Sequence, residues 1–312
     1  MNEAKRRATP PAAAWRLRPE RGNLLLLRGM TWLSLRLGRG PARWVLSGVS
    51  LYFLLFAPVA RRASRAYLTR ALGRKPGWRE LFAHFHCFAT TIHDRVFLLN
   101  NRCDLFAVEL HGEALLRAVL AEGRGAFLMG AHLGSFELLR AMGRRQPGLR
   151  IGMVMYEDNA RKINAALAAI NPAAQLDVVP LGRLDSMLRV RDRLDDGMIL
   201  GLLGDRSLDA GPTLTLPFLG APAEFPLGPM RLAAMLRRPV LFMAGIHLGG
   251  NRYAIHFEPL ADFSQLPAGG RDAAVQAAVG DFAACLERHC RATPYNWFNF
   301  YDFWGAASGG KP

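Results

Sequence analysis

The stretch Gly125-Ala-Phe-Leu-Met-Gly-Ala-His132-Leu-Gly-Ser-Phe-Glu137 combines a strand, a tight turn and the start of a helix. Its first half is an apolar run typical of a buried strand, and a glycine-containing turn leads into a helix predicted over residues 136–143. In open α/β sheets, ligands bind where strands end and helices begin. His132 is therefore predicted at the carboxyl end of a strand, beside a helix amino terminus.

The chain after residue 107 alternates short apolar runs with helical patterns, which is typical of a sheet wrapped by helices. The predicted strands are Gly125–Gly130, Ile151–Tyr156, Leu176–Val179, Met198–Leu203, Thr213–Leu216, Val240–Ile246 and Tyr253–Phe257. The predicted helices are Trp78–Asn100, Phe136–Gly143, Ala160–Ile170, Leu184–Leu194, Pro229–Leu236 and Ala273–Cys290. The pattern predicts an α/β fold with a mixed, mostly parallel sheet flanked by helices.

The net charge of +15 is concentrated in the first quarter of the chain. Residues 1–80 carry 17 Lys and Arg against three Glu, a net charge of +14, and the remaining residues are almost balanced. A basic segment attracts anionic lipid headgroups and nucleic acid alike. Long aliphatic stretches lie among these basic residues and no recognised nucleic-acid motif accompanies them, so an anionic membrane surface is favoured and nucleic acid is not expected.

The longest uncharged apolar stretch runs from Trp44 to Ala60 and has 17 residues. This length is at the lower limit for crossing a bilayer core. Arginines on both sides disfavour simple crossing, so an interfacial or re-entrant amphipathic segment is favoured over a true span or a core helix. We predict a disordered basic tail over residues 1–14, an N-terminal membrane-associated helical segment over 15–65 and a catalytic domain over 66–312.

The cysteines give neither a disulfide pattern nor a metal pattern. Cys87, Cys103, Cys285 and Cys290 contain no Cys-x-x-Cys pair, and a reducing compartment fits them. Cys285 and His289 share one face of a predicted helix, but without further ligands we interpret them as ordinary surface or core residues. No metal and no cofactor is expected.

His132 and Glu137 are the predicted catalytic pair. A neutral imidazole at a strand end can take a proton from an alcohol, and a carboxylate one helical turn further can hold the other ring nitrogen. Of the eight histidines, only His132 is followed by an acidic residue five positions later. The backbone N–H groups of Gly134 and Ser135 are the expected oxyanion donors. The alternative is a capping histidine before an ordinary first helical turn.

Three blocks of the sequence carry a resemblance to a known family. The first is His132-Leu-Gly-Ser-Phe-Glu137, and the second is Leu202-Leu-Gly-Asp-Arg-Ser-Leu-Asp-Ala-Gly211, followed by Leu216-Pro-Phe-Leu-Gly220. The third is Pro229-Met-Arg-Leu-Ala-Ala-Met-Leu-Arg-Arg-Pro-Val240. In this order and spacing they resemble the bacterial lipid A biosynthesis acyltransferases, of lauroyl and myristoyl type, within the lysophospholipid acyltransferase superfamily.

The resemblance implies a glycerolipid acyltransferase-like fold and an enzyme at the cytoplasmic face of the inner membrane. Such an enzyme moves an acyl chain from a thioester on acyl carrier protein, or on coenzyme A, to a hydroxyl of a membrane lipid. By resemblance, His132 is the general base, Glu137 its partner and Asp205 the acid of the second block. Arg183 matches a basic residue that meets a phosphate of acceptor or donor. Arg206 is interpreted either as phosphate-binding or as a loop ion-pair partner.

Two stretches depart from the pattern of lipid A acyltransferases. They are Ala223-Glu-Phe-Pro226 and the aromatic stretch from Pro294 to Trp304. With these departures the sequence looks closer to the branch of the family found in aryl polyene and related lipid-pigment pathways. The aromatic side chains are interpreted as packing, ahead of a membrane-interface belt or the lining of an acyl channel.

Two other functions stay open on the sequence. One is a non-catalytic membrane-surface lipid-binding protein, in which the histidine block is only a turn. The other is a lipid or thioester hydrolase on the same scaffold, which would use water as the acceptor. The sequence contains no Gly-x-Ser-x-Gly elbow, Walker loop or complete Gly-x-Gly-x-x-Gly, so serine hydrolase, NTPase and dinucleotide-binding functions lose their main support.

Overall fold

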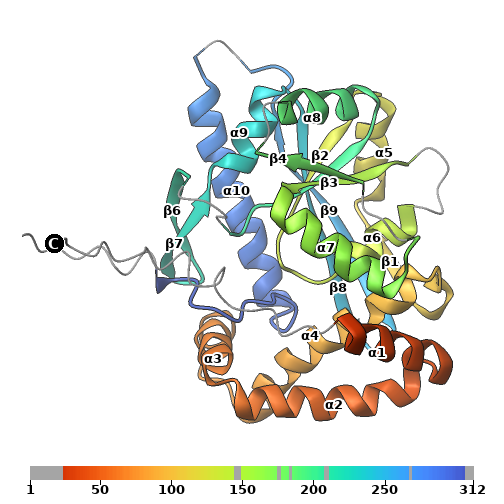
Figure 1. Ribbon diagram of the computed structural model, residues 1–312. Coiled ribbons are helices and arrows are strands. Elements are labelled where there is room, and N and C mark those ends of the chain that lie inside the picture. Colours follow the sequence, from red (N-terminus) through yellow and green to blue (C-terminus); the bar gives the residue numbers. More distant parts are fainter. Residues whose placement is uncertain are drawn as a thin grey trace, which may run out of the picture.

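A seven-stranded sheet forms the centre of the computed structural model, which describes residues 24–143, 149–173, 177–182, 185–206, 211–266 and 269–305 (Figure 1). The strand order is β1-β9-β8-β2-β5-β3-β4. Its strands are β1 (Ala107–His111), β2 (Ala126–Gly130), β3 (Ile151–Tyr156), β4 (Val178–Leu181), β5 (Ile199–Leu203), β8 (Pro239–Gly249) and β9 (Arg252–Asp262). The predicted α/β fold is confirmed. The predicted tail over residues 1–14 lies outside the described residues.

The sheet is mixed because one hairpin reverses the strand direction. Strands β8, β2, β5, β3 and β4 are parallel to one another, whereas β9 pairs antiparallel with β8 and parallel with β1. Every residue of β2 is buried, as expected for the middle strand of a sheet covered on both faces. The carboxyl ends of β2 and β5 therefore lie side by side at one edge of the sheet.

Helices cover both faces of the sheet. They are α1 (Leu24–Leu37), α2 (Arg39–Phe56), α3 (Pro58–Leu72), α4 (Trp78–Leu99), α5 (Glu113–Ala121), α6 (Phe136–Gly143), α7 (Glu157–Ile170), α8 (Ser186–Asp195), α9 (Gly228–Met235) and α10 (Arg271–Ala292). Successive side chains of β2 point to opposite faces: Phe127 and Met129 join the core beneath α10, and Ala126 and Leu128 join the core beneath α4 and α6.

The sequence missed two strands, each for a physical reason. Strand β1 lies at the edge of the sheet, with Glu109 and His111 on exposed or half-buried positions, so it has no apolar run. Strand β7 (Ala221–Pro226) pairs with β6 (Thr213–Phe218) in a separate hairpin and contains two prolines. Proline cannot donate to a ladder, so the pattern of β7 is not that of a central strand.

The first three helices form a separate layer along one end of the molecule, at the bottom of Figure 1. Leu46, Ser50 and Leu54 form the buried stripe of α2 at a spacing of four residues. No single described helix is long and apolar enough to cross a bilayer. Helices α2 and α3 together have suitable length and composition, but the chain bends by 95° between them. The membrane-associated segment predicted over residues 15–65 therefore stays a prediction.

A buried ion pair fastens this layer to the sheet. The Asp94 side chain on α4 is almost fully buried and accepts two hydrogen bonds of 2.6 Å from the Arg39 guanidinium at the start of α2. The Tyr253 hydroxyl on β9 donates a third hydrogen bond, of 2.7 Å, to the same carboxylate. Three elements far apart in sequence thus share one buried charge, which is stable only while its partners stay in place.

We expect Arg39→Met to destabilise the protein by about 3 kcal/mol, because it leaves the Asp94 carboxylate buried without its cation. Chemical denaturation followed by circular dichroism would measure the change in the free energy of unfolding. Arg117→Met is the matched control, since the Arg117–Glu113 pair on α5 is largely exposed, and such pairs contribute less than about 1 kcal/mol. Equal effects of the two substitutions would contradict a structural role for the Arg39–Asp94 pair.

Candidate active site

The ends of two adjacent parallel strands bring His132 and Asp205 together. Gly130 at the end of β2 is in register with Leu203 at the end of β5, and each side chain follows two residues after its strand. The His132 Nδ1 atom lies 2.9 Å from one Asp205 carboxylate oxygen and 3.2 Å from the other. The sequence predicted both residues at the site, but it did not predict that they pair.

The Asp205 carboxylate is completely buried and receives several donors. The backbone N–H of His132 and the indole N–H of Trp297 each donate to it over 3.1 Å, and the Arg206 guanidinium lies 3.9 Å away. Burial alone would raise the pKa of Asp205, but His132, its N–H groups and Arg206 outweigh burial and hold the pKa far below its usual range. Asp205 is therefore a fixed anion.

This anion fixes the proton arrangement of the imidazole. An ionised carboxylate can only accept hydrogen bonds, so Nδ1 of His132 is the donor and Nε2 carries the lone pair. The His132 side chain is 36% exposed to solvent. Burial and the charge of Arg206 lower the pKa of His132 below its ordinary value, against the raising effect of Asp205. A neutral imidazole with a free Nε2 lone pair can act as a general base.

Glu137 lies elsewhere, which corrects the predicted pairing. Its carboxylate forms an ion pair of 3.0 Å with Arg95 on α4. Glu137 occupies the first turn of α6, and from there its side chain reaches the neighbouring helix, whereas the ring nitrogen of His132 is held by Asp205. The carboxylate that orients His132 is that of Asp205. A role of Glu137 in turnover stays a prediction.

The turn after His132 is built by backbone contacts, which also corrects an expectation. The N–H of Gly134 donates to the Asn296 carbonyl over 2.9 Å, and the N–H of Ser135 donates to the Gly245 carbonyl over 2.8 Å. Both donors predicted for the oxyanion are thus engaged within the protein. Gly134 has a φ of +69°, and a Cβ there would lie 2.0 Å from the Gly245 oxygen. Only glycine fits this approach.

The aromatic stretch near the carboxyl terminus forms the other wall of the site. Trp297 is completely buried, and the backbone N–H of Phe298 donates to the His132 carbonyl over 2.8 Å. Trp297, Phe303 and Trp304 belong to the main core, which confirms the interpretation of these aromatics as packing. The direct contact of the Trp297 indole with Asp205 was not foreseen. It joins residues 92 positions apart, so the local pattern contained no signal for it.

A buried histidine, His84, contacts the segment that carries Trp297. The ring of His84 on α4 lies 2.9 Å from the Trp297 carbonyl oxygen through Nε2 and 2.8 Å from the Ser64 hydroxyl through Nδ1. Burial lowers the pKa of His84 to about 4, so the ring stays neutral at physiological pH. His84 therefore connects α3 and α4 to the segment that carries Trp297.

The two arginines predicted to bind substrate have different outcomes. Arg183 lies outside the described residues. Arg206 is mostly buried and donates to the Phe298 carbonyl over 2.9 Å, and its guanidinium lies 4.8 Å from the centre of the Tyr301 ring. These contacts hold Arg206 against the carboxyl-terminal segment, and a partner within its own loop stays a prediction. Its binding of a substrate phosphate stays a prediction.

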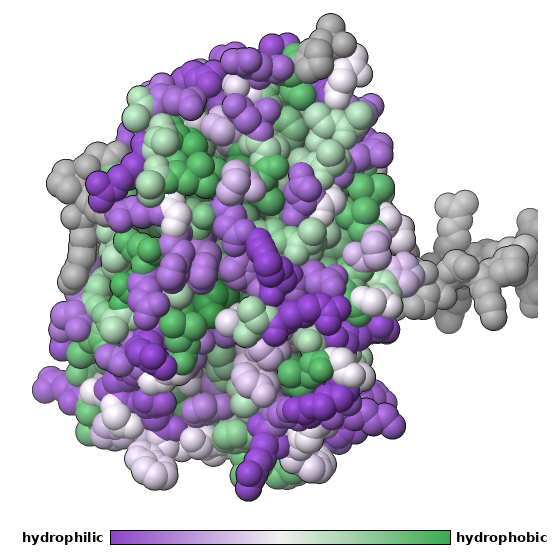
Figure 2. Space-filling view, turned by 180° about the vertical axis from the view of Figure 1, so that it is seen from behind, coloured by the Kyte–Doolittle hydropathy of each residue, from purple (hydrophilic) through white to green (hydrophobic). Residues whose placement is uncertain are grey.

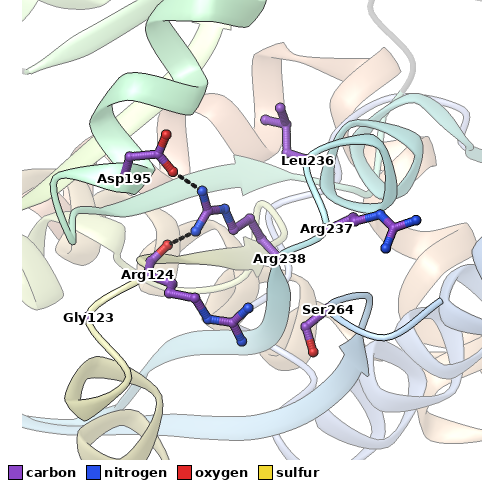
Figure 3. Close-up of a pocket in the computed structure, with 7 residues that line it drawn as sticks. All are labelled: Gly123, Arg124, Asp195, Leu236, Arg237, Arg238 and Ser264. Carbon is purple, nitrogen blue, oxygen red and sulfur yellow. Dashed lines mark hydrogen bonds and ion pairs between the residues drawn. The ribbon is translucent and has the colours of Figure 1, made fainter.

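A pocket of about 350 Å³ lies at the opposite end of the parallel strands. It is lined by Gly123, Arg124, Asp195, Leu236, Arg237, Arg238 and Ser264. Figure 3 shows the Arg238 guanidinium held between the Asp195 carboxylate and the Arg124 carbonyl oxygen. These residues precede β2, β5 and β8, whereas His132 follows β2. None of the predicted site residues that the structure describes lines this pocket.

Comparison with known families agrees with the geometry. The sequence profile of the bacterial lipid A biosynthesis acyltransferases matches residues 91–305, which include β1 to β9 and both His132 and Asp205. A comparison with curated proteins gives no match. The matched region covers more than two thirds of the 312 residues. The chain therefore belongs to the bacterial lipid A biosynthesis acyltransferase family, whose members are O-acyltransferases.

Proposed function

We propose that this acyltransferase moves a fatty acyl chain from a thioester, on acyl carrier protein or coenzyme A, to a hydroxyl of a membrane lipid of the lipid A class. The observation that supports the mechanism is the His132–Asp205 pair at the carboxyl edge of the sheet. It leaves Nε2 of a partly exposed, neutral imidazole available to a hydroxyl. The aryl polyene branch stays a prediction about the acceptor, because the matched family is described only as lipid A biosynthesis acyltransferases.

In the proposed reaction, the acceptor hydroxyl gives its proton to Nε2 of His132 while its oxygen bonds to the thioester carbonyl carbon. The tetrahedral intermediate then collapses, the carbon–sulfur bond breaks, and the leaving thiolate takes the proton back from His132. Asp205 stabilises the imidazolium that forms between these steps. Neither step requires a metal, a cofactor or a protein nucleophile. Arg183 and Arg206 are the proposed contacts for phosphate groups of the substrates.

The acceptor is proposed to reach the site from the cytoplasmic face of the inner membrane. Among the described residues, 13 of the 20 exposed large hydrophobic side chains lie within residues 30–59. Trp44 is 84% exposed to solvent and Phe56 is 69% exposed. Seen from behind in Figure 2, the surface carries hydrophobic patches among hydrophilic side chains. Apolar side chains next to a strongly basic segment fit an interfacial helix on an anionic membrane.

Replacing His132 by Ala should abolish acyl transfer, because Arg206 and Trp297, the other described side chains in contact with Asp205, cannot take the hydroxyl proton. Asp205→Asn should lower kcat by roughly three to four orders of magnitude, since an amide can hold the wrong tautomer of the ring. The assay follows labelled acyl-carrier-protein thioester into extracted membrane lipids, with free fatty acid measured alongside. Product from His132→Ala at the wild-type rate would rule out the proposed base, and free fatty acid without acylated lipid would indicate a hydrolase.

The pH profile should show an acid limb below pH 6.5, because His132 must be neutral and its pKa lies below the ordinary 6.5. Activity is lost as the pH falls through this pKa. Arg206→Gln removes a charge that lowers the pKa of His132, so the limb should move to higher pH. Asp205→Asn should move it to lower pH. Glu137→Gln is the control and should leave the limb unmoved, whatever its effect on kcat; a shift would mean that Glu137 acts on His132 directly.

Trp44→Glu combined with Phe56→Glu should reduce binding to vesicles that contain anionic lipid by at least tenfold, because both side chains are exposed on α2. Cosedimentation of the full-length protein with the vesicles measures this. The control is Leu188→Glu on α8. Leu188 is 54% exposed, and α8 lies at the opposite end of the molecule from α2 (Figure 1). Equal losses for α2 and α8 would argue against a membrane-facing α2.

A further inference from the structure

Side chains able to hold a metal ion converge between β9 and α10, on the face of the sheet that α10 covers. His256 and Glu258 are two residues apart on β9 and so point to the same face. His289 lies on α10, and the ligand atoms of the three residues lie within 4.8 Å of one another. Cys285, one helical turn before His289, places its sulfur 3.6 Å from a Glu258 oxygen.

The side chains of this cluster now contact one another directly, and a bound ion would replace these contacts. His289 Nε2 lies 2.6 Å from one Glu258 oxygen, and Arg288 pairs with the other oxygen. The Arg288 side chain keeps 55% of its exposure, so it can turn into solvent without breaking the core. The ring of His256 stacks on His111, with ring centroids 4.6 Å apart, and meets His289 edge-on at 5.0 Å.

We propose that His256, Glu258 and His289 bind a divalent transition-metal ion of the zinc class, in a site separate from His132 and Asp205. Two imidazoles and a carboxylate form a common zinc ligand set, and the fourth position is open to water or to the Cys285 sulfur.

Such an ion would fasten the end of α10 to the sheet immediately before the aromatic wall of the active site. The Thr293 N–H donates to the His289 carbonyl over 2.9 Å where α10 ends. Asn296, Trp297 and Phe298 follow within the next five residues and hold the Gly134 turn, Asp205 and the His132 carbonyl. Metal binding is therefore expected to stabilise the folded state, because the unfolded chain lacks the assembled ligands.

The test uses the purified full-length protein, stripped with a chelator, mixed with Zn²⁺ and desalted. We expect about one zinc per chain by elemental analysis, which the ligand set predicts, and a higher Tm than for the stripped protein. His256→Gln and His289→Gln should each lose the bound zinc and the rise in Tm, while circular dichroism checks that they fold. His256 is half-buried and tolerates replacement better than the buried His289, so it gives the decisive variant.

Two controls separate an ion site from a plain ion-pair cluster. His111→Gln removes a histidine that touches the cluster but lies outside the ligand set, and it should keep the zinc. Arg288→Ala removes a competitor for the Glu258 carboxylate and should keep or tighten zinc binding. A wild-type protein that retains no zinc, a folded His256→Gln variant that retains it fully, or an Arg288→Ala variant that loses it would each overturn the proposal.

Discussion

The buried carboxylate of Asp205 is the constraint on which the active site depends. An anion without solvent contact persists only if donors surround it, and here those donors come from the β2 turn, from the ring of His132 and from Trp297 near the carboxyl terminus. The same contacts that keep the charge stable therefore determine where the His132 ring points. Stability of the fold and orientation of this imidazole have one physical origin.

The surrounding shell is assembled from segments that are distant along the chain. The turn at Gly134 is hydrogen-bonded to the carbonyl groups of Gly245 on β8 and Asn296. The ring of His84 on α4 is hydrogen-bonded to the carbonyl of Trp297. Each of these contacts uses a backbone group on at least one side. Such a shell tolerates changes of side chain poorly where backbones touch, as at Gly134.

The sequence predicted what depends on local pattern and missed what depends on the meeting of distant segments. Strands β2 and β5 are buried apolar runs, so their positions, and hence the site edge, were predictable. Edge strand β1 has no such run. The position of His132 at the end of a strand was predictable, but its carboxylate partner was sought five residues away, whereas Asp205 lies 73 residues further along. The role of Trp297 and the neighbourhood of His256 and His289 depend equally on how β9, α10 and the last residues come together.

The ion pair between Arg39 and Asp94 has a consequence for how this enzyme can be divided. The apolar helix α2 supplies the cation that neutralises a carboxylate inside the folded body. Deleting the apolar amino-terminal region to obtain a water-soluble fragment would leave the Asp94 carboxylate buried without its cation, next to the Tyr253 hydroxyl of the sheet. A buried charge thus ties the layer of α1 to α3 to the sheet, and solubility has to be sought by changing the exposed face of α2 instead of removing it.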